Sequence, residues 1–175
     1  KFPADVFESD NHEIVYRYRI TGEKWRFHRT AVLREFPFPE PERKVSNFQD
    51  GIIWMRIARK YRELYINEAL RIYHESEDGL SVVRPKKVAY ICMTANLSKL
   101  NEDIDYIPLS PLLFLRAAVH YVRFSSHDRV RLSDQYRQLR NRKAKMLFVL
   151  AYLPGRIVFS LDSFRFSVRS KGKLA

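Results

Sequence analysis

The pattern of the sequence changes near residue 85, and this change limits the folds that the chain can adopt. Before it, the predicted elements are short and are separated by turn formers, including the prolines at positions 37, 39 and 41. Proline lacks a backbone N–H and restricts the preceding residue, so this cluster excludes a helix there. We therefore expect a mixed α/β part over residues 1–84 and a mainly helical part over residues 85–175.

Short strands and two helices are predicted in the first part. Composition rich in β-branched and aromatic side chains predicts strands at residues 13–20, 64–67 and 69–74. Thr30 can cap a short helix over residues 31–36. Ser46 and Gln49 have the spacing of a capping box, which predicts a mostly buried helix ending near Tyr61.

Helices dominate the second part. Apolar periodicity predicts them at residues 85–100, 111–124 and 145–153. An acidic loop is expected at residues 101–106, and a polar helix or linker at residues 128–143. Pro154-Gly155 is expected to end the last helix, and residues 157–168 fit either a strand or a helix facing a membrane.

Positive charge is concentrated near the C-terminal end. The chain has a formal net charge of +12, yet residues 129–173 hold 12 Lys and Arg against two Asp, a net charge of +10. Residues 1–128 are nearly neutral at +2. Such a tail can bind anionic lipid, nucleic acid or a polyanionic substrate, or it can be a solvated basic face.

Cysteine content and hydropathy bear on the compartment. The single cysteine, Cys92, excludes an intrachain disulfide and a cysteine zinc cluster, and its apolar neighbours predict a buried thiol in a reducing, cytoplasmic setting. The sequence has no run of 18 consecutive apolar residues, so we do not expect a membrane-spanning helix.

Asp50 is the best candidate for chemistry. It is predicted in the first turn of the helix that ends near Tyr61, where the helix dipole keeps a carboxylate ionised. Such a group can take the proton from a hydroxyl that attacks a sugar, but it can also cap backbone amides. Both roles stay open on the sequence pattern alone.

Several spaced motifs, in order, resemble bacterial glycosyltransferase family 2 proteins with the GT-A fold. The first is Gly22-Glu23-Lys24 followed by Arg29-Thr30-Ala31-Val32-Leu33-Arg34-Glu35-Phe36-Pro37-Phe38-Pro39. The next are Trp54-x-Arg56-Ile57-Ala58-x-Lys60-Tyr61, Ile66-Asn67-Glu68-x-Leu70-Arg71-Ile72-Tyr73 and Gly79-Leu80-Ser81. Tyr121-Val122-Arg123-Phe124-Ser125-x-His127 and Leu153-Pro154-Gly155 resemble the helical tail of that group. The likeness covers roughly residues 20–170.

The resemblance implies roles for individual residues. Asp50 stands where the family has its catalytic base, although Glu is usual there. Trp25, Arg26 and His28 stand on the acceptor side, where Trp can stack on a sugar ring and Arg can bind a phosphate. Packing in the core is the alternative for Trp25. His74 would face the donor diphosphate, although a lone His is more commonly a satisfied polar group.

The family's nucleotide-binding half is not in this sequence. A GT-A protein binds Mg²⁺ or Mn²⁺ through an Asp-x-Asp motif after a hydrophobic strand, whereas Asp103-Ile104-Asp105 is predicted between two helices and is rejected as that motif. We therefore expect no metal in these residues and no activity from them alone. A separate half would bind the metal and the nucleotide-sugar donor.

The resemblance predicts an inverting sugar transfer to a carbohydrate or lipid-linked acceptor, in surface polysaccharide or glycoconjugate synthesis. The setting would be the cytoplasm, at the inner face of the cell membrane. The alternative is a basic module that binds an anionic surface or nucleic acid without catalysis. Nucleic acid is the less favoured of these partners, because no known nucleic-acid-binding motif is present.

Overall fold

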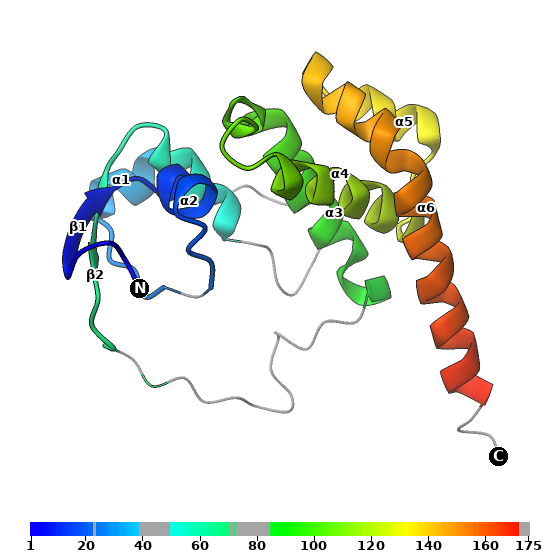
Figure 1. The fold of residues 1–175 in the computed structure, drawn as a ribbon, viewed down its shortest axis with the longest axis horizontal. Helices are drawn as coiled ribbons and strands as arrows, with labels where there is room; N and C mark the ends of the chain where they lie inside the picture. Colours follow the sequence, from blue (N-terminus) through cyan, green and yellow to red (C-terminus); the bar gives the residue numbers. More distant parts are fainter. Residues whose placement is uncertain (23, 39–49, 71, 73–84, 172–175) are drawn as a thin grey trace. The chain divides into compact units, whose positions relative to one another are not determined.

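A computed structural model describes all residues except 23, 39–49, 71, 73–84 and 172–175. The fold is mixed but mainly helical, with one two-stranded sheet among the described residues. Contacts divide the chain into two compact units, Lys1–Val82 and Val83–Ala175, which Figure 1 colours from blue to green and from green to red. The assignment of separate roles to residues 1–84 and 85–175 stays a prediction.

The sheet of the first unit joins two short strands. β1 (Val6–Ser9) pairs antiparallel with β2 (Glu63–Ile66), and Val6 lies opposite Ile66. β2 confirms the strand predicted at residues 64–67 to within one residue. The strand predicted at residues 69–74 is wrong for positions 69, 70 and 72, which have no regular structure, and its other positions lie outside the described residues.

Residues 13–20 do not form the predicted strand. Glu13–Arg17 (η1) is a single π-helical turn, in which the Tyr18 amide donates to the Glu13 carbonyl at 3.0 Å. Asp10 fixes its start, because its Oδ1 accepts the Glu13 amide at 2.9 Å. Asp10 and Glu13 have capping-box spacing, a helical signal that the argument from composition overlooked.

Two short helices complete the described part of the first unit. α1 (Thr30–Glu35) confirms the predicted short helix to within one residue. α2 (Gly51–Ala58) lies inside the predicted longer helix but ends before Tyr61. The capping box expected at residues 46–49 lies outside the described residues. α2 supplies part of the core through Ile52, Ile53, Ile57 and Ala58.

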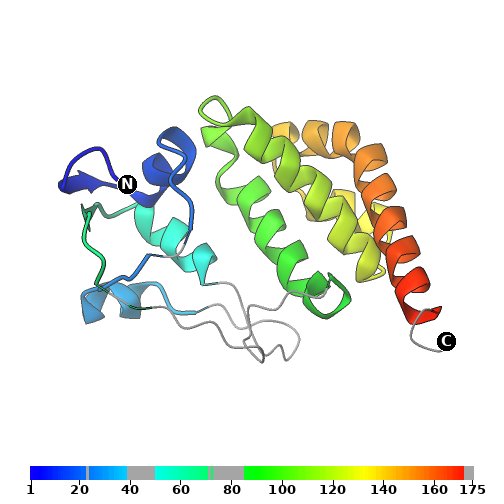
Figure 2. The same cartoon turned by 60° about the horizontal axis from the view of Figure 1, so that its bottom comes forward.

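Helices are the only regular secondary structure of the second unit in the residues that the structure describes. They are α3 (Pro85–Glu102), η2 (Ile104–Tyr106), α4 (Pro111–His127), α5 (Leu132–Gln138) and α6 (Arg142–Lys171). α4 packs extensively against both α3 and α6, as Figures 1 and 2 show. The predictions for α3 and α4 are confirmed, and Pro111 is at the start of α4, where its missing N–H costs nothing. The loop expected at 101–106 is instead the end of α3 and a 3₁₀ turn.

α6 runs through Pro154, so the predicted end of a helix there is wrong, as is the possible strand over residues 157–168. A proline inside a helix removes one hydrogen bond and bends the axis rather than always ending it. Figures 1 and 2 both show α6 bending along its length. The glycine of Pro154-Gly155 has a steric reason. A Cβ at Gly155 would lie 2.6 Å from Val122 Cβ and 2.9 Å from the Val119 carbonyl oxygen of α4. Close helix contact, rather than helix termination, accounts for this glycine.

A cluster of charged side chains joins α4 to α6. Arg123 donates to both carboxylate oxygens of Asp162, at 2.6 and 2.9 Å, and His127 Nε2 lies 2.9 Å from Asp162 Oδ2. The three side chains are largely buried. Burial acts to raise the pKa of Asp162, but the hydrogen bonds from Arg123 and His127 outweigh it, and the pKa is lowered.

The continuity of α6 also changes the expectation for a membrane. Among the described residues, one helix is long and apolar enough to cross a bilayer by length and composition, the 23-residue stretch Arg142–Phe164. Pro154, which was expected to end a helix, lies inside this stretch, so no spanning helix was expected from the sequence. Length and composition alone do not distinguish a spanning helix from other apolar helices.

Candidate functional site

An extended segment before α1 presents two different faces. Along residues 24–29, partly buried and exposed side chains alternate, because successive side chains of an extended chain point to opposite sides. Lys24, Arg26 and His28 are on the partly buried side, and Trp25, Phe27 and Arg29 are on the exposed side. The segment therefore combines polar groups on one face with an aromatic pair on the other.

Arg26 is held in a network that reaches across the first unit. Its Nη1 donates to both carboxylate oxygens of Glu63 in β2, at 3.0 and 2.9 Å. Its Nη2 donates to Asn11 Oδ1 at 2.7 Å. The Tyr65 hydroxyl donates to the same Glu63 carboxylate at 2.5 Å. Burial, followed by this hydrogen bond, raises the pKa of Tyr65, so the phenol stays protonated.

His28 and Trp54 form a stacked pair. Their ring centroids are 4.6 Å apart with an interplanar angle of 8°, and the Arg26 guanidinium lies 5.7 Å from the Trp54 ring centroid. Burial is the main cause that lowers the pKa of His28, with Arg26 adding to it and Glu63 opposing it. The imidazole is therefore neutral at physiological pH. Its Nε2 is buried and finds no hydrogen-bond partner among the described residues.

A pocket of about 1140 Å³ opens beside this segment and β2. All six residues of the extended segment line it, and so do Tyr61, which lies between α2 and β2, and the four residues of β2. The three residues predicted for the acceptor side, Trp25, Arg26 and His28, thus all line one pocket. The volume is slightly above the usual range for ligand pockets, about 300–1,000 Å³.

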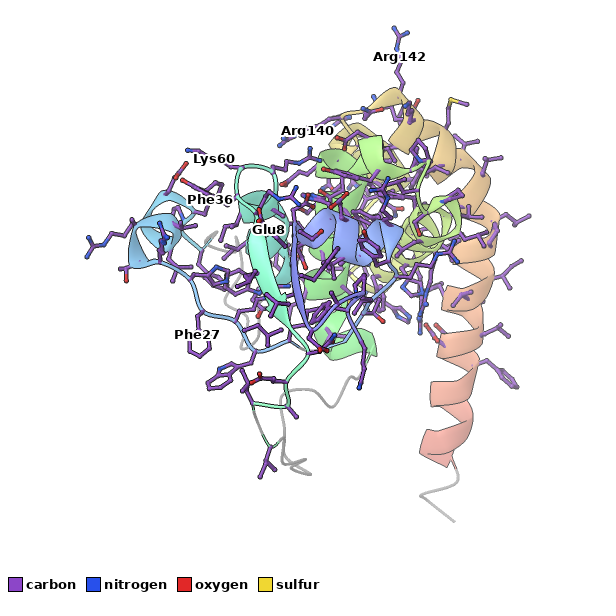
Figure 3. All side chains as sticks on the ribbon, turned by 60° about the vertical axis from the view of Figure 1, so that its left-hand side comes forward. Glu8, Phe27, Phe36, Lys60, Arg140 and Arg142 are labelled. Carbon is purple, nitrogen blue, oxygen red and sulfur yellow. The ribbon has the colours of Figure 1, made fainter. Side chains whose placement is uncertain are left out.

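Trp25 and Phe27 give the pocket an exposed aromatic rim. Their ring centroids are 4.8 Å apart, and the two residues are 55% and 78% exposed. Figure 3 shows Phe27 projecting outward from the segment. Trp25 therefore does not belong to the core, which was the alternative for this residue. Trp54 is partly buried, and its ring stacks on His28.

Asp50 is exposed at the N-terminal end of α2. It occupies the N-cap position, but its side chain makes no capping hydrogen bond, so the capping role left open by the sequence is wrong. Its carbonyl accepts the Trp54 amide at 3.4 Å, which places Asp50 one turn before the ring that stacks on His28. Asp50 is not among the residues that line the pocket.

Sequence reasoning missed Glu63, which holds Arg26 in place. Its partner is far away along the chain, and no local motif connects the two. The sequence nonetheless held a signal for Glu63. Glu63 and Tyr65 are two residues apart in a strand, so their side chains must face the same side. An acid on the buried side of a strand requires a partner, and the nearby arginines were the candidates.

Two other predictions concern metal and diphosphate. His74 lies outside the described residues. Across the described ranges, no three His, Cys, Asp or Glu side chains come together in a way that could hold a metal ion. Asp103 precedes the 3₁₀ turn η2, and Asp105 lies within it. The described residues thus do not fit the Mg²⁺ or Mn²⁺ that the resemblance implies, and no chemical step is assigned to a metal here.

Cys92 in α3 is partly rather than fully buried, and burial raises the pKa of its thiol. It lies in the second unit, apart in sequence from the pocket residues. In comparisons with family models, with curated proteins and with solved structures, no match to the chain was found.

Proposed function

We propose that the first unit is the acceptor side of an inverting glycosyltransferase with a GT-A arrangement. One observation carries the proposal: Trp25, Arg26 and His28, chosen from sequence, line a single pocket with an exposed aromatic rim. Aromatic faces beside hydrogen-bonding groups suit a carbohydrate, whose C–H faces stack while its hydroxyls bond. The pocket is large enough for more than one sugar ring.

Asp50 serves as general base in this proposal. Its carboxylate accepts the proton of an acceptor hydroxyl as that oxygen bonds to the anomeric carbon of the donor sugar. The bond from that carbon to the nucleoside diphosphate breaks on the opposite side, and the diphosphate leaves with the electron pair. A single displacement of this kind inverts the anomeric configuration. The exposure of Asp50 and the lack of a capping bond leave its carboxylate accessible for this step.

Arg26 has a different part from the one first expected. Its guanidinium is committed to Glu63 and Asn11, so we assign it to shaping the wall rather than to binding phosphate. His28 is neutral and its unpartnered Nε2 is buried, so we assign His28, stacked on Trp54, to the pocket wall rather than to a hydrogen bond with the acceptor. Trp25 supplies the stacking face.

The rest of the reaction is assigned to a separate domain. The resemblance puts the nucleotide-sugar donor and its Mg²⁺ or Mn²⁺ on a nucleotide-binding half that this sequence does not include. The acceptor would be a carbohydrate or a lipid-linked carbohydrate made for surface polysaccharide or glycoconjugate. The place of action would be the cytoplasmic face of the cell membrane.

The acceptor site is tested first with the 175-residue chain. Oligosaccharides of bacterial surface polymers are titrated while tryptophan fluorescence is recorded, because the chain has only Trp25 and Trp54. Binding is expected to change the emission of wild type, and Trp25→Phe is expected to lose that change together with most affinity. Leu33→Gln, an exposed site outside the pocket, is the control. Failure of every oligosaccharide tested to bind would contradict the acceptor site.

The base is tested in the protein that joins this chain to a nucleotide-sugar-binding domain. Asp50→Asn is expected to lower kcat by about 10²- to 10⁴-fold with little change in the KM for acceptor, as for loss of a general base. Asp5→Asn, an exposed Asp outside the pocket, is the matched control and should keep full activity. If Asp50→Asn retains more than about a tenth of the activity, Asp50 is not the base.

A further inference from the structure

The outer face of α6 carries a continuous apolar stripe. Seven large side chains on it are each more than half exposed: Met146, Val149, Leu150, Leu153, Ile157, Leu161 and Phe164. Their spacing of three or four residues puts them on one side of the helix. From Met146 to Phe164 the stripe is about 27 Å long. We call these seven residues the α6 stripe.

The opposite face of α6 is occupied by α4. Ala144, Phe148, Ala151 and Gly155 are buried, and Gly155 meets Val122 of α4. The stripe is therefore the side that packing inside the second unit leaves exposed. Large contiguous apolar surface of this kind marks a contact with a protein or a membrane rather than ordinary surface.

The charges in the middle of α6 are directed toward α4. Between Met146 and Phe164 the only charged residues are Arg156 and Asp162. Asp162 is paired with Arg123 and His127 of α4. Arg156 lies over the Phe159 ring at 5.1 Å and donates to Ser126 Oγ of α4 at 3.3 Å. The stripe itself therefore carries no charge.

Basic residues bound the stripe in sequence at both ends. Arg142, Lys143 and Lys145 precede it, and Arg165, Arg169, Lys171 and Lys173 follow it. Figure 3 shows Arg142 projecting away from the helix into solvent. Of the two acids after position 128, Asp162 is neutralised by its partners and Asp134 pairs with Arg137. The surroundings of the stripe are thus strongly cationic.

The positive charge around the α6 stripe favours one of two partners for this surface, a lipid bilayer over a second copy of the chain. A second copy of the chain would bring two regions of net charge +10 together, and like charges across an interface are unfavourable. An anionic bilayer surface attracts the same cations and accepts the apolar stripe below its headgroups. We infer that the α6 stripe docks the second unit on an anionic lipid bilayer.

The helix lies in the plane of the interface rather than across the bilayer. Its inner face is packed on α4 and holds the Arg123–Asp162–His127 cluster, which could not enter hydrocarbon without a large desolvation cost. A helix with one apolar face and one face on a folded unit fits an interfacial position. This inference does not rest on the glycosyltransferase proposal, because it uses only residues of the second unit.

The test is flotation of the 175-residue chain with lipid vesicles. Wild type is expected to bind vesicles of phosphatidylcholine mixed with phosphatidylglycerol, and this binding should weaken as the salt concentration rises. Its binding to vesicles of phosphatidylcholine alone is expected to be much weaker. Leu150→Gln/Leu153→Gln is expected to lower the partition coefficient at least about tenfold. Arg142→Gln/Lys143→Gln is expected to lower it by about fivefold per cation on the anionic vesicles only.

The matched control is Leu112→Gln/Leu132→Gln, which changes two exposed leucines of the same unit outside α6 and should bind like wild type. Circular dichroism checks that each variant keeps its helices. As a second readout, Leu153→Trp should show blue-shifted emission with anionic vesicles, whereas Leu112→Trp should not.

Four results would overturn the inference. One is no binding to anionic vesicles, and another is equal binding by the stripe double variant. The third is a dimer in lipid-free sedimentation that Leu150→Gln/Leu153→Gln abolishes, which would assign the stripe to a second copy. Binding to DNA that the stripe variant leaves unchanged, with no vesicle binding, would also replace lipid by nucleic acid as the partner.

Discussion

Gly155 lies where α6 approaches α4 too closely for a side chain. In an ordinary helix interior, changing Gly to Ala stabilises by about 1 kcal/mol. Here a methyl group would lie 2.6 Å from Val122 Cβ and 2.9 Å from a backbone oxygen, which can move only if α4 moves. The steric cost of overpacking, about 1–3 kcal/mol, is therefore expected to exceed the gain in helix propensity.

The first prediction is that Gly155→Ala lowers the free energy of unfolding by about 1–2 kcal/mol. Urea unfolding followed by circular dichroism measures it. Gly51→Ala is the control, because a Cβ at Gly51 meets nothing within 4 Å and should leave stability unchanged or slightly higher. A Gly155→Ala chain at least as stable as wild type would show that the two helices can separate at no cost.

His28 gives the first unit a dependence on pH. Burial lowers the pKa of His28 below its unfolded value of about 6.5, so the unfolded chain binds the proton first as the pH falls. The His28 contribution to stability is therefore highest above that value. It falls as the pH decreases through about 6.5 and levels off below the folded pKa.

The second prediction is that urea unfolding of the first unit, followed by tryptophan emission, requires less urea at pH 5 than at pH 7. In His28→Phe, which keeps a ring against Trp54, this dependence is expected to be smaller. Both tryptophans lie in the first unit, so the signal excludes the histidines of the second. An equal pH dependence in wild type and His28→Phe would remove His28 as its source.

At the scale of elements, α4 and α6 are held together by the Asp162 cluster as well as by packing. Replacing the carboxylate leaves Arg123 with no anion in a largely buried position. Removing one partner of a buried ion pair costs more than the pair itself contributes, because the remaining charge is desolvated without compensation. Since the pKa of Asp162 is lowered, its contribution is present above about pH 4 and is lost as the pH falls through the folded pKa.

The third prediction is that Asp162→Asn destabilises the chain by about 2–4 kcal/mol at neutral pH, and by less as the pH falls below 4. Denaturant unfolding at several pH values measures both effects. Asp134→Asn breaks only an exposed pair with Arg137 and should change stability by less than about 1 kcal/mol. Similar losses in the two variants would contradict a special role for the cluster.

The elements also show which local signals are sufficient. α3 and α4 were predictable because a proline starts each one and apolar periodicity continues through it. η1 was not predicted, because its β-branched and aromatic residues favour a strand, whereas the capping pair Asp10 and Glu13 starts a helical turn. The continuity of α6 could not be inferred from Pro154, since the partner that requires Gly155 is in another helix.

In the candidate site, too, some features could be predicted from local sequence and others could not. Trp25, Arg26 and His28 could be selected together because they are neighbours in sequence, and all three line one pocket, although Trp25 is on the opposite face of the extended segment from Arg26 and His28. The pairing of Arg26 with Glu63 joins positions far apart and depends on the β1–β2 sheet, so no local pattern predicts it. The exposure of Trp25 likewise depends on tertiary packing rather than on its neighbours.

At the scale of the whole molecule, the two units differ in how their contacts are distributed along the chain. The second unit packs α4 against the preceding helix α3 and also against α6, and its Arg123–Asp162 contact spans 39 residues. In the first unit, the Arg26–Glu63 contact spans a similar 37 residues, but the β1–β2 sheet pairs Val6 with Ile66 and closes a longer loop. The two units therefore meet different entropic costs when they fold.

The pairing of β1 with β2 has a consequence for synthesis on the ribosome. The N-terminal strand leaves the exit tunnel well before its partner exists, and must wait while more than fifty further residues are added. During that interval its backbone groups are open to chaperones or to strands of other nascent chains. In the helical unit, by contrast, α3 can pack on the following helix α4 as soon as both have left the tunnel, before the rest of that unit is made.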